Sequence, residues 1–128
     1  MENFDGKIAV ITGGGTGMGR ELTYQLAAEG CHVSICDVIE ENMEETFQEA
    51  TKKYPQVKIT KHLCDVSSEE DVLRFRDEVL EQQKTEHINL LFNNAGIGGG
   101  ASFVLSGIEE WERTFKICWD GVYLCSRA

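Results

Sequence analysis

Four short apolar runs alternate with four stretches of helical periodicity along the chain, and this alternation narrows the possible folds more than any other feature. The apolar runs are Lys7–Thr12, His32–Cys36, Val57–His62 and Ile88–Phe92. The first run, Lys7–Thr12, is continuous rather than alternating, as in a strand that is buried on both faces of a parallel sheet. Strands joined by helices form right-handed crossovers. The sequence therefore predicts one α/β domain over residues 1–128, with a doubly wound parallel sheet of strand order 3-2-1-4 that ends after the fourth strand and its following helix.

Apolar side chains recur at helical spacing in the segments between and after these runs. The first helix, Gly17–Gly30, carries Leu22, Leu26 and Ala27, and the second, Glu40–Lys53, carries Met43, Phe47 and Ala50. The third carries Val72, Phe75, Val79 and Leu80, and the fourth carries Ile108, Trp111, Phe115, Trp119 and Val122. Capping boxes at Ser67–Glu70 and Ser106–Glu109 predict where the third and fourth helices begin.

The formal net charge of −10, from 22 acidic and 12 basic residues, argues against a surface that binds polyanions. We therefore expect neither nucleic-acid binding nor binding to anionic membranes. The acidic residues gather in Glu40–Glu49 and Glu69–Glu81, where they form the solvated faces of helices. No apolar run approaches the ~20 residues that a membrane-spanning helix needs.

The five cysteines and three histidines show no metal-binding pattern, because there is no C-x-x-C pair and no ligand-like spacing. An odd number of cysteines in an otherwise ordinary chain indicates a reducing compartment. Residues 1–12 include acidic side chains and only a five-residue apolar run, which is unlike a signal or transit peptide. We therefore expect a cytoplasmic protein without a metal site.

A glycine-rich loop, Thr12–Arg20 (TGGGTGMGR), joins the first strand to the first helix. The N-terminus of a helix gathers unpaired amides at the positive end of its dipole, where a pyrophosphate binds readily. Gly13 permits the tight turn, Gly17 lets the backbone approach phosphates, and Gly19 lets the helix pack closely on the sheet. The alternative is a merely structural glycine turn. The flanking strand and helix favour a dinucleotide site of Rossmann type, and the absence of Gly-Lys-Ser/Thr excludes a P-loop.

Asp37 ends the second strand, 18 residues after Gly19. A carboxylate at this position accepts hydrogen bonds from the hydroxyls of an adenosine ribose and repels a 2′-phosphate. At ~4 Å and an effective dielectric constant near 20, that repulsion is on the order of 4 kcal/mol. Neither Thr16 nor Val38 supplies a compensating cation, although Arg20 is near in sequence. The sequence therefore favours NAD over NADP, and the alternative or additional role for Asp37 is that of a helix N-cap.

Three motifs together resemble those of the short-chain dehydrogenase/reductase family. They are Thr12-Gly-x-x-x-Gly-x-Gly19, then Asp65, then Asn93-Asn94-Ala95-Gly96, and the resemblance runs from Lys7 to the last residue. It implies an NAD(P)-dependent oxidoreductase that transfers a hydride between the nicotinamide cofactor and a small-molecule alcohol or carbonyl substrate.

The resemblance also implies a role for each motif residue. Gly13, Gly15, Thr16, Gly17, Met18 and Gly19 would hold the pyrophosphate, and Asp37 the adenosine ribose. Asp65 and Val66 would bracket the adenine, Asn93, Ala95 and Gly96 would line the nicotinamide-ribose side, and Asn94 would brace the sheet. All follow the carboxyl ends of strands, where open α/β sheets bind ligands. For Asp65, capping of the third helix is the alternative role.

Cys118 occupies the position in the fourth helix where the family usually carries an asparagine that helps to hold a water of the proton relay. A thiol is a weak hydrogen-bonding group, so a relay through this position would be weaker or built differently. The alternative is that Cys118 serves only in packing.

The catalytic residues that the resemblance implies are absent from this sequence. The family's serine and its Tyr-x-x-x-Lys pair lie beyond the position of Ala128. Tyr54 and Lys58 match the pair by letters, but Pro55 prevents a shared helical face. We therefore expect the N-terminal, cofactor-binding portion of a longer enzyme, inactive by itself.

The resemblance places the fourth helix in a homo-oligomer interface. A glycine-rich turn is expected at Gly96–Gly100, and we expect Gly98–Gly100 to border the substrate cleft. Within residues 1–128 the strand Ile88–Phe92 has no further strand to pair with, so we expect it at an edge of the sheet. We also expect Trp111, Phe115 and Trp119 to be partly uncovered.

Two other functions stay open at this point. One is a non-catalytic dinucleotide-binding or interaction module, which needs no catalytic residues. The other is a methyltransferase built on the same half-fold, in which the Asn93–Gly96 motif would have no evident task.

Overall fold

The computed structural model describes residues 3–99 and 102–128. In this part of the chain the sheet has four parallel strands in the order β3-β2-β1-β4, which confirms the predicted topology. The strands are β1 (Ile8–Thr12), β2 (His32–Asp37), β3 (Ile59–Leu63) and β4 (Leu90–Phe92). Since β4 pairs only with β1, it is an edge strand, as expected.

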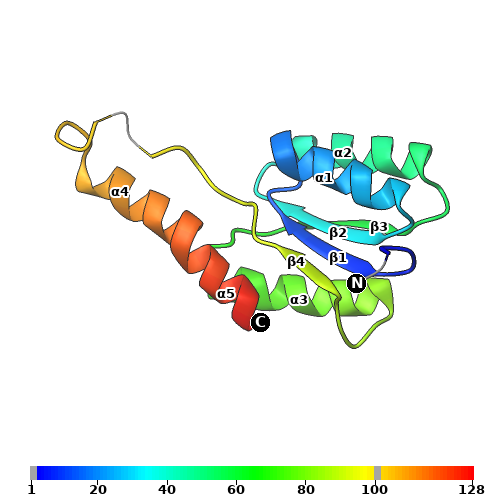
Figure 1. Cartoon of the computed structure of the whole chain (residues 1–128). Helices are drawn as coiled ribbons and strands as arrows, with labels where there is room; N and C mark the ends of the chain where they lie inside the picture. Colours follow the sequence, from blue (N-terminus) through cyan, green and yellow to red (C-terminus); the bar gives the residue numbers. More distant parts are fainter. Residues whose placement is uncertain (1–2, 100–101) are drawn as a thin grey trace.

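Helices cover both faces of the sheet. They are α1 (Gly17–Ala28), α2 (Glu40–Lys53), α3 (Glu69–Gln83), α4 (Ile108–Phe115), the π-helical segment η1 (Lys116–Asp120) and α5 (Gly121–Arg127). α1 and α2 lie on one face, and α3 and α5 on the other (Figure 1). Residues 100–101, which include Gly100 of the glycine run, lie outside the described residues.

Alternate residues of each strand face opposite layers, as the parallel-sheet interpretation requires. Ala9, Ile11, Val33 and Ile35 pack against α1 and α2, together with Leu26, Met43 and Ala50. Val10, Cys36 and Cys64 face the α3 side, together with Val66, Val72, Phe75 and Val79. β1 and β2 are therefore covered on both faces, which accounts for the continuous apolar run of β1.

Gly30 ends α1 in the predicted manner. Its φ of +81° is in the left-handed region that favours glycine. The Gly30 amide donates to the carbonyl of Ala27 (3.1 Å), and the Cys31 amide donates to the carbonyl of Leu26 (3.0 Å). This Schellman motif satisfies the last carbonyls of the helix and turns the chain into β2.

Several local predictions are wrong. Ser68, not Ser67, is the N-cap residue of α3, and its hydroxyl accepts a hydrogen bond from the Asp71 amide. Ser106 does not cap α4, whose N-cap residue is Gly107. β3 begins two residues later than expected and β4 is two residues shorter at its start. The expected glycine turn is absent over residues 96–99, which form an irregular segment instead.

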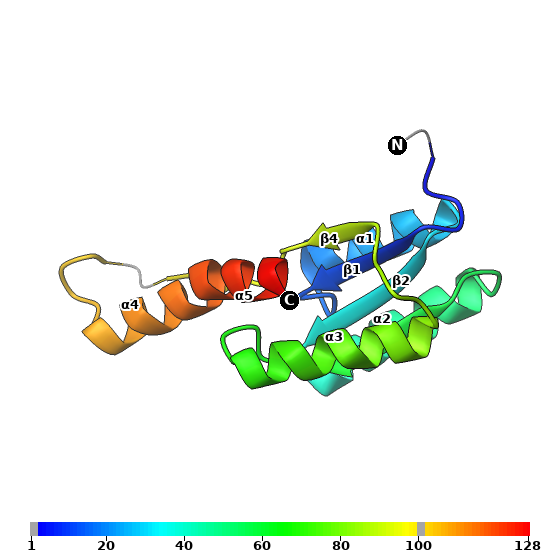
Figure 2. The ribbon, with the colours of Figure 1, turned by 90° about the horizontal axis from the view of Figure 1, so that it is seen from below.

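The last three helical segments form one continuous rod, because the backbone stays helical through Phe115, Lys116, Asp120 and Gly121. Figure 2 shows that the α4 end of this rod extends beyond the sheet. No residue of α4 is buried. Across the described residues, no helix combines the length and the apolar character needed to cross a bilayer.

Candidate functional site

One cavity of about 450 Å³ borders the carboxyl ends of all four strands. Its volume lies within the range of ligand sites, ~300–1,000 Å³. Nine of the twelve residues predicted to bind the cofactor line it: Gly13, Thr16, Gly17, Met18, Asp37, Asp65, Val66, Ala95 and Gly96. Gly15, Gly19 and Asn93 do not. Folding therefore brings most of the motif residues to a single hollow, although they come from four separate loops.

The glycine loop has the geometry that its spacing predicts. Gly13 turns out of β1 with a φ of +69°. At Gly19 a Cβ atom would lie 2.1 Å from the carbonyl oxygen of Gly13, so only glycine lets α1 approach this closely. Gly17 has a φ of +55°, and no atom lies within 4 Å of where its Cβ would be. The backbone is thus open to a ligand at Gly17, which fits the approach of phosphates.

Asp37 presents a carboxylate that backbone amides already hold. Oδ1 accepts hydrogen bonds from the amides of Val38 (2.8 Å) and Ile39 (3.2 Å), and Oδ2 accepts one from the amide of Gly15 (3.0 Å). A carboxylate has about four acceptor positions, and three of those of Asp37 are therefore occupied. Asp37 is not a helix N-cap, the alternative role considered for it, because Ile39 is the N-cap residue of α2.

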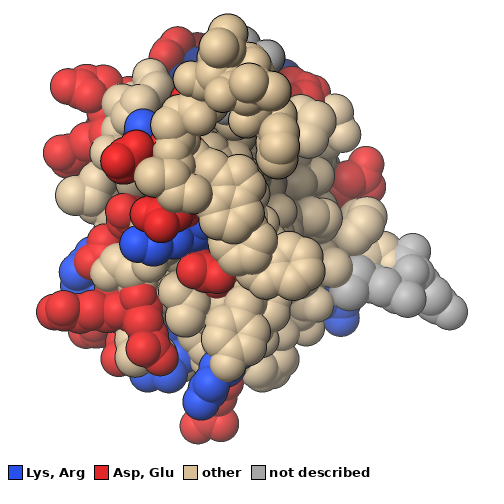
Figure 3. All heavy atoms as spheres, turned by 90° about the vertical axis from the view of Figure 1, so that its left-hand side faces the viewer, with Lys and Arg blue, Asp and Glu red and all other residues tan. Residues whose placement is uncertain are grey.

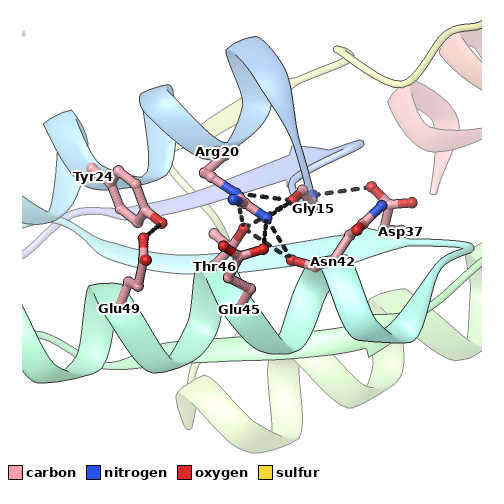
Figure 4. Close-up of polar contacts among 8 residues, drawn as sticks. All are labelled: Gly15, Arg20, Tyr24, Asp37, Asn42, Glu45, Thr46 and Glu49. Carbon is pink, nitrogen blue, oxygen red and sulfur yellow. Dashed lines mark hydrogen bonds and ion pairs between the residues drawn. The ribbon is translucent and has the colours of Figure 1, made fainter.

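Arg20 lies outside the cavity, between α1 and α2. Figure 4 shows its guanidinium directed toward Gly15 and α2, with Gly15 between it and the carboxylate of Asp37. Arg20, which the sequence left open as a partner for a 2′-phosphate, is thus engaged in contacts within the protein.

Asn94 braces the loops after β1 and β4, as expected. Its Nδ2 donates to the carbonyls of Thr12 (3.0 Å) and Gly13 (3.1 Å). The hydroxyl of Thr12 in turn accepts hydrogen bonds from the amides of Asn94 (3.1 Å) and Ala95 (3.0 Å). These bonds hold together the two adjacent loops, both of which line the cavity.

Asp65 and Val66 follow β3 at the adenine side predicted for the cavity. Asp65 is exposed, and its Oδ1 accepts hydrogen bonds from the amide (2.9 Å) and the hydroxyl (2.6 Å) of Ser67. The carboxylate therefore orders the turn before α3 without being the N-cap residue. Val66 is buried against Gly121, where a Cβ would lie 2.7 Å from Val66 Cγ2.

Asn93 does not join the cavity. Its Nδ2 donates to the hydroxyl of Ser126 on α5 (3.0 Å). Its Oδ1 is buried and has no hydrogen-bond partner among the described residues. The family role carried over to Asn93 is therefore not evident in this side-chain geometry.

The long rod contributes cavity residues that sequence reasoning missed. Arg113 of α4 and Ile117 of η1 line the cavity opposite the strand ends. No sequence signal could have found them, because their position depends on the path of the long segment after β4. Cys36 and Cys64 also line the cavity, and the hydrogen bond of the Cys36 thiol with Cys64, together with burial, holds the pKa of Cys36 well above its ordinary value. That thiol is neutral at physiological pH and is not a nucleophile.

Cys118 lies in the π-helical turn and faces the segment after β4. Its Sγ contacts the carbonyl oxygen of Ile97 at 3.6 Å. It also lines a second hollow, of about 790 Å³, together with Gly99, Trp111 and Trp119. This hollow is mostly apolar and carries no charged side chain, so it is a less suitable place for a pyrophosphate than the smaller cavity.

No catalytic pair or metal cluster accompanies the cavity within the part of the chain that the structure describes. Tyr54 is the C-cap residue of α2, and Lys58 precedes β3, so the Tyr54–Lys58 match does not lie on a helix. Over residues 3–99 and 102–128, no group of three or more metal-ligating side chains is found. All five cysteines are free.

Comparison with known proteins identifies one family and one fold. The sequence model of the short chain dehydrogenase family matches residues 7–128. The meso-2,3-butanediol dehydrogenase of Serratia marcescens is 33% identical over 124 residues, which cover 97% of this chain and 47% of that protein. The chain thus spans about half the length of this curated relative.

Solved structures of complexes share the architecture. A short-chain dehydrogenase/reductase from Burkholderia phymatum, in complex with NAD, is 33% identical with a TM-score of 0.90 over 99% of this chain and 44% of that one. The L-sorbose reductase of Gluconobacter frateurii, complexed with NADPH and L-sorbose, has a TM-score of 0.89 over 98% of this chain and 46% of that one. It is only 24% identical, so it shows the shared fold alone. By its family match, its strand order and its cavity at the strand ends, this chain belongs to the short-chain dehydrogenase/reductase family of oxidoreductases.

Proposed function

We propose that the cavity at the carboxyl edge of the sheet binds NAD(H) for an oxidoreductase acting on an alcohol or carbonyl compound. The observation that carries the proposal is the convergence of the open backbone at Gly17, the fixed carboxylate of Asp37 and the loops after β3 and β4 on one cavity. The pyrophosphate would lie over residues 13–19 at the N-terminus of α1. There the unpaired amides and the helix dipole favour an anion.

Asp37 would select the cofactor. One acceptor position of its carboxylate remains for a ribose hydroxyl, whereas a second hydroxyl would have to displace one of the three amides. A 2′-phosphate has no proton to donate and repels the carboxylate by about 4 kcal/mol at ~4 Å. Because contacts with Gly15 and α2 hold Arg20, NAD is favoured over NADP.

The rest of the cavity would hold the two bases. The adenine would lie between Asp65 and Val66, with Ile117 on the far side. The nicotinamide ribose would lie beside Ala95 and Gly96. The apolar hollow that Gly99 lines, next to Cys118, would then be on the substrate side.

A bound nicotinamide supplies the hydride chemistry, and this chain would supply orientation and the exclusion of NADP. No serine and helical Tyr-x-x-x-Lys pair of the family's kind accompanies the cavity in these 128 residues. We therefore expect cofactor binding without turnover from this chain alone. In the full-length protein, α4–η1–α5 would contribute to a homo-oligomer.

A non-catalytic dinucleotide-binding module is the second candidate. It needs only the cavity and the carboxylate of Asp37, which the described residues supply. Substrate turnover by a longer product of the same gene would exclude it. A stable product of these residues that binds NADH without turnover would support it.

The test of cofactor choice is Asp37→Asn, which removes the charge and keeps the side-chain size. Titration with NADH and NADPH should show that the ratio of their dissociation constants, NADPH over NADH, falls by at least about tenfold. The control is Asp77→Asn, which removes an exposed carboxylate on α3. An unchanged ratio for Asp37→Asn would refute the assignment of Asp37.

A further inference from the structure

The guanidinium of Arg20 joins the glycine loop to α2. Its Nε and Nη2 both donate to the carbonyl oxygen of Gly15, at 3.0 and 2.6 Å. Nε also donates to the hydroxyl of Thr46 (2.9 Å), and Nη2 also donates to the carbonyl of Asn42 (3.2 Å) and pairs with Glu45 (3.0 Å). We call these five residues the Arg20 cluster (Figure 4). The arginine side chain is only 22% exposed, so its hydrogen bonds are partly shielded from water.

Gly15 connects this cluster to Asp37. The carbonyl of Gly15 faces Arg20 and the hydroxyl of Thr46 (3.1 Å), and its amide donates to Oδ2 of Asp37 (3.0 Å). Gly15 is closely packed, because a Cβ at this position would lie 2.8 Å from Oδ2 of Asp37 and 3.0 Å from Cβ of Asn42. A shift of Gly15 would therefore move the amide that holds Oδ2 of Asp37.

We propose that Arg20 is a positioning residue that fixes the carboxylate of Asp37 through Gly15, and thereby sets the discrimination between NAD and NADP. This inference rests on the proposed function. Arg20 does not line the cavity; it holds the carbonyl of Gly15, the residue whose amide holds Asp37. Hydrogen bonds from a charged donor are about twice as strong as neutral ones, so two such bonds hold the Gly15 carbonyl firmly.

The experiment compares Arg20→Gln, Arg20→Lys and Thr46→Val with the wild-type chain in NADH and NADPH titrations. Arg20→Gln should weaken NADH binding by about tenfold. NADPH binding should weaken less, so that the NADPH/NADH ratio of dissociation constants falls. Arg20→Lys keeps the charge but not the planar fork and should restore part of the NADH affinity. Thr46→Val, which removes one donor to Gly15, should act in the same direction but less strongly.

The matched control is Arg74→Gln. Arg74 also bridges a helix to a backbone carbonyl, with bonds to Asp71 (3.0 Å) and to the carbonyl of Leu63 (3.1 Å), but it has no contact with the glycine loop. Its loss should lower stability and leave both dissociation constants within about twofold. If Arg20→Gln and Thr46→Val also leave the ratio unchanged, the positioning role is refuted.

Failure of the proposed function gives a different result. In that case the wild-type chain itself binds no NADH, and hydrogen exchange in the ligand-free protein decides the positioning role. Faster exchange of the Gly15 amide in Arg20→Gln than in Arg74→Gln supports the mechanical link to Asp37. Equal exchange at Gly15 in the two variants overturns it.

Discussion

At the scale of single residues, the buried side chain of His62 belongs to a series of hydrogen-bonded polar side chains between the sheet and α3. His62 is 3% exposed, and its Nδ1 lies 2.8 Å from Oε2 of Glu78. Its Nε2 lies 2.8 Å from the hydroxyl of Thr60, which donates to the hydroxyl of Ser34 (2.6 Å). Burial lowers the pKa of His62 below its ordinary value of 6.5, although the hydrogen bond and charge of Glu78 act in the opposite direction. The folded protein thus favours the neutral imidazole.

This lowered pKa predicts a loss of stability on acidification. In the unfolded chain His62 binds its proton near pH 6.5, whereas in the folded protein it binds the proton only at lower pH. The stabilisation that comes from the neutral imidazole is therefore fully present above pH 6.5, and it is lost as the pH decreases toward the folded pKa. The loss is about 1.4 kcal/mol for each unit of pKa difference. Chemical denaturation at a series of pH values between about 7.5 and 5 measures it.

The variant His62→Gln should remove most of this dependence. His87→Gln, which changes an exposed histidine before β4, is the matched control and should keep it. A wild-type stability that is flat across the same pH range would show that the burial of His62 has no net effect on its protonation.

At the scale of helices and strands, sequence reasoning succeeded where the pattern is long and failed where it is short. The strand order follows from four apolar runs and the right-handed crossover rule, which depend on many residues at once. The capping boxes rest on two residues each. Ser67 and Ser68 are adjacent serines with acidic residues three positions later, Glu70 and Asp71, so the sequence alone does not distinguish the two registers.

The corrected cap predicts a difference between two serine substitutions. Ser68→Ala should lower the free energy of unfolding by about 1 kcal/mol, because the amide of Asp71 loses its hydrogen-bond acceptor. Ser106→Ala should change it by less than about 0.5 kcal/mol, because Ser106 does not cap α4. Denaturant unfolding of both variants checks this, and an equal loss in both would contradict the assigned caps.

The candidate site was predictable to the same degree. The glycine loop, Asp37 and Asp65 were found because their positions after strands follow from local sequence. The roles of Arg20, Arg113 and Ile117 were not, because each depends on contacts with distant parts of the chain. Tertiary packing, rather than local spacing, decides such positions.

At the scale of the whole molecule, an uncovered apolar surface lies on α4 and η1. Trp111, Phe115 and Trp119 are 54%, 42% and 67% exposed, and their rings stack in sequence with centroids 5.2 and 5.8 Å apart. Figure 3 shows the corresponding end of the molecule, where a band of uncharged side chains has acidic groups beside it. A contiguous patch of aromatic side chains is typical of a protein interface.

This surface predicts self-association of the isolated chain. Sedimentation velocity should show an average mass that rises with protein concentration, and Trp111→Glu should reduce that rise because it places a charge within the patch. Leu73→Glu, which changes an exposed apolar residue on α3, should leave the association unchanged. A strictly monomeric wild-type chain at all concentrations would contradict the interface proposed for α4–η1–α5.

A map of backbone amide shifts by NMR during titration with NADH tests the assignment of the cavity. Saturable shifts are expected at Gly13, at residues 16–18 and at Asp37, Asp65 and Ala95, which line the cavity. Amides at the amino edge of the sheet, such as Thr85 and His87, should stay unchanged. No saturable shift, or shifts confined to the hollow beside Trp111 and Trp119, would contradict the assignment of the strand-end cavity as the dinucleotide site.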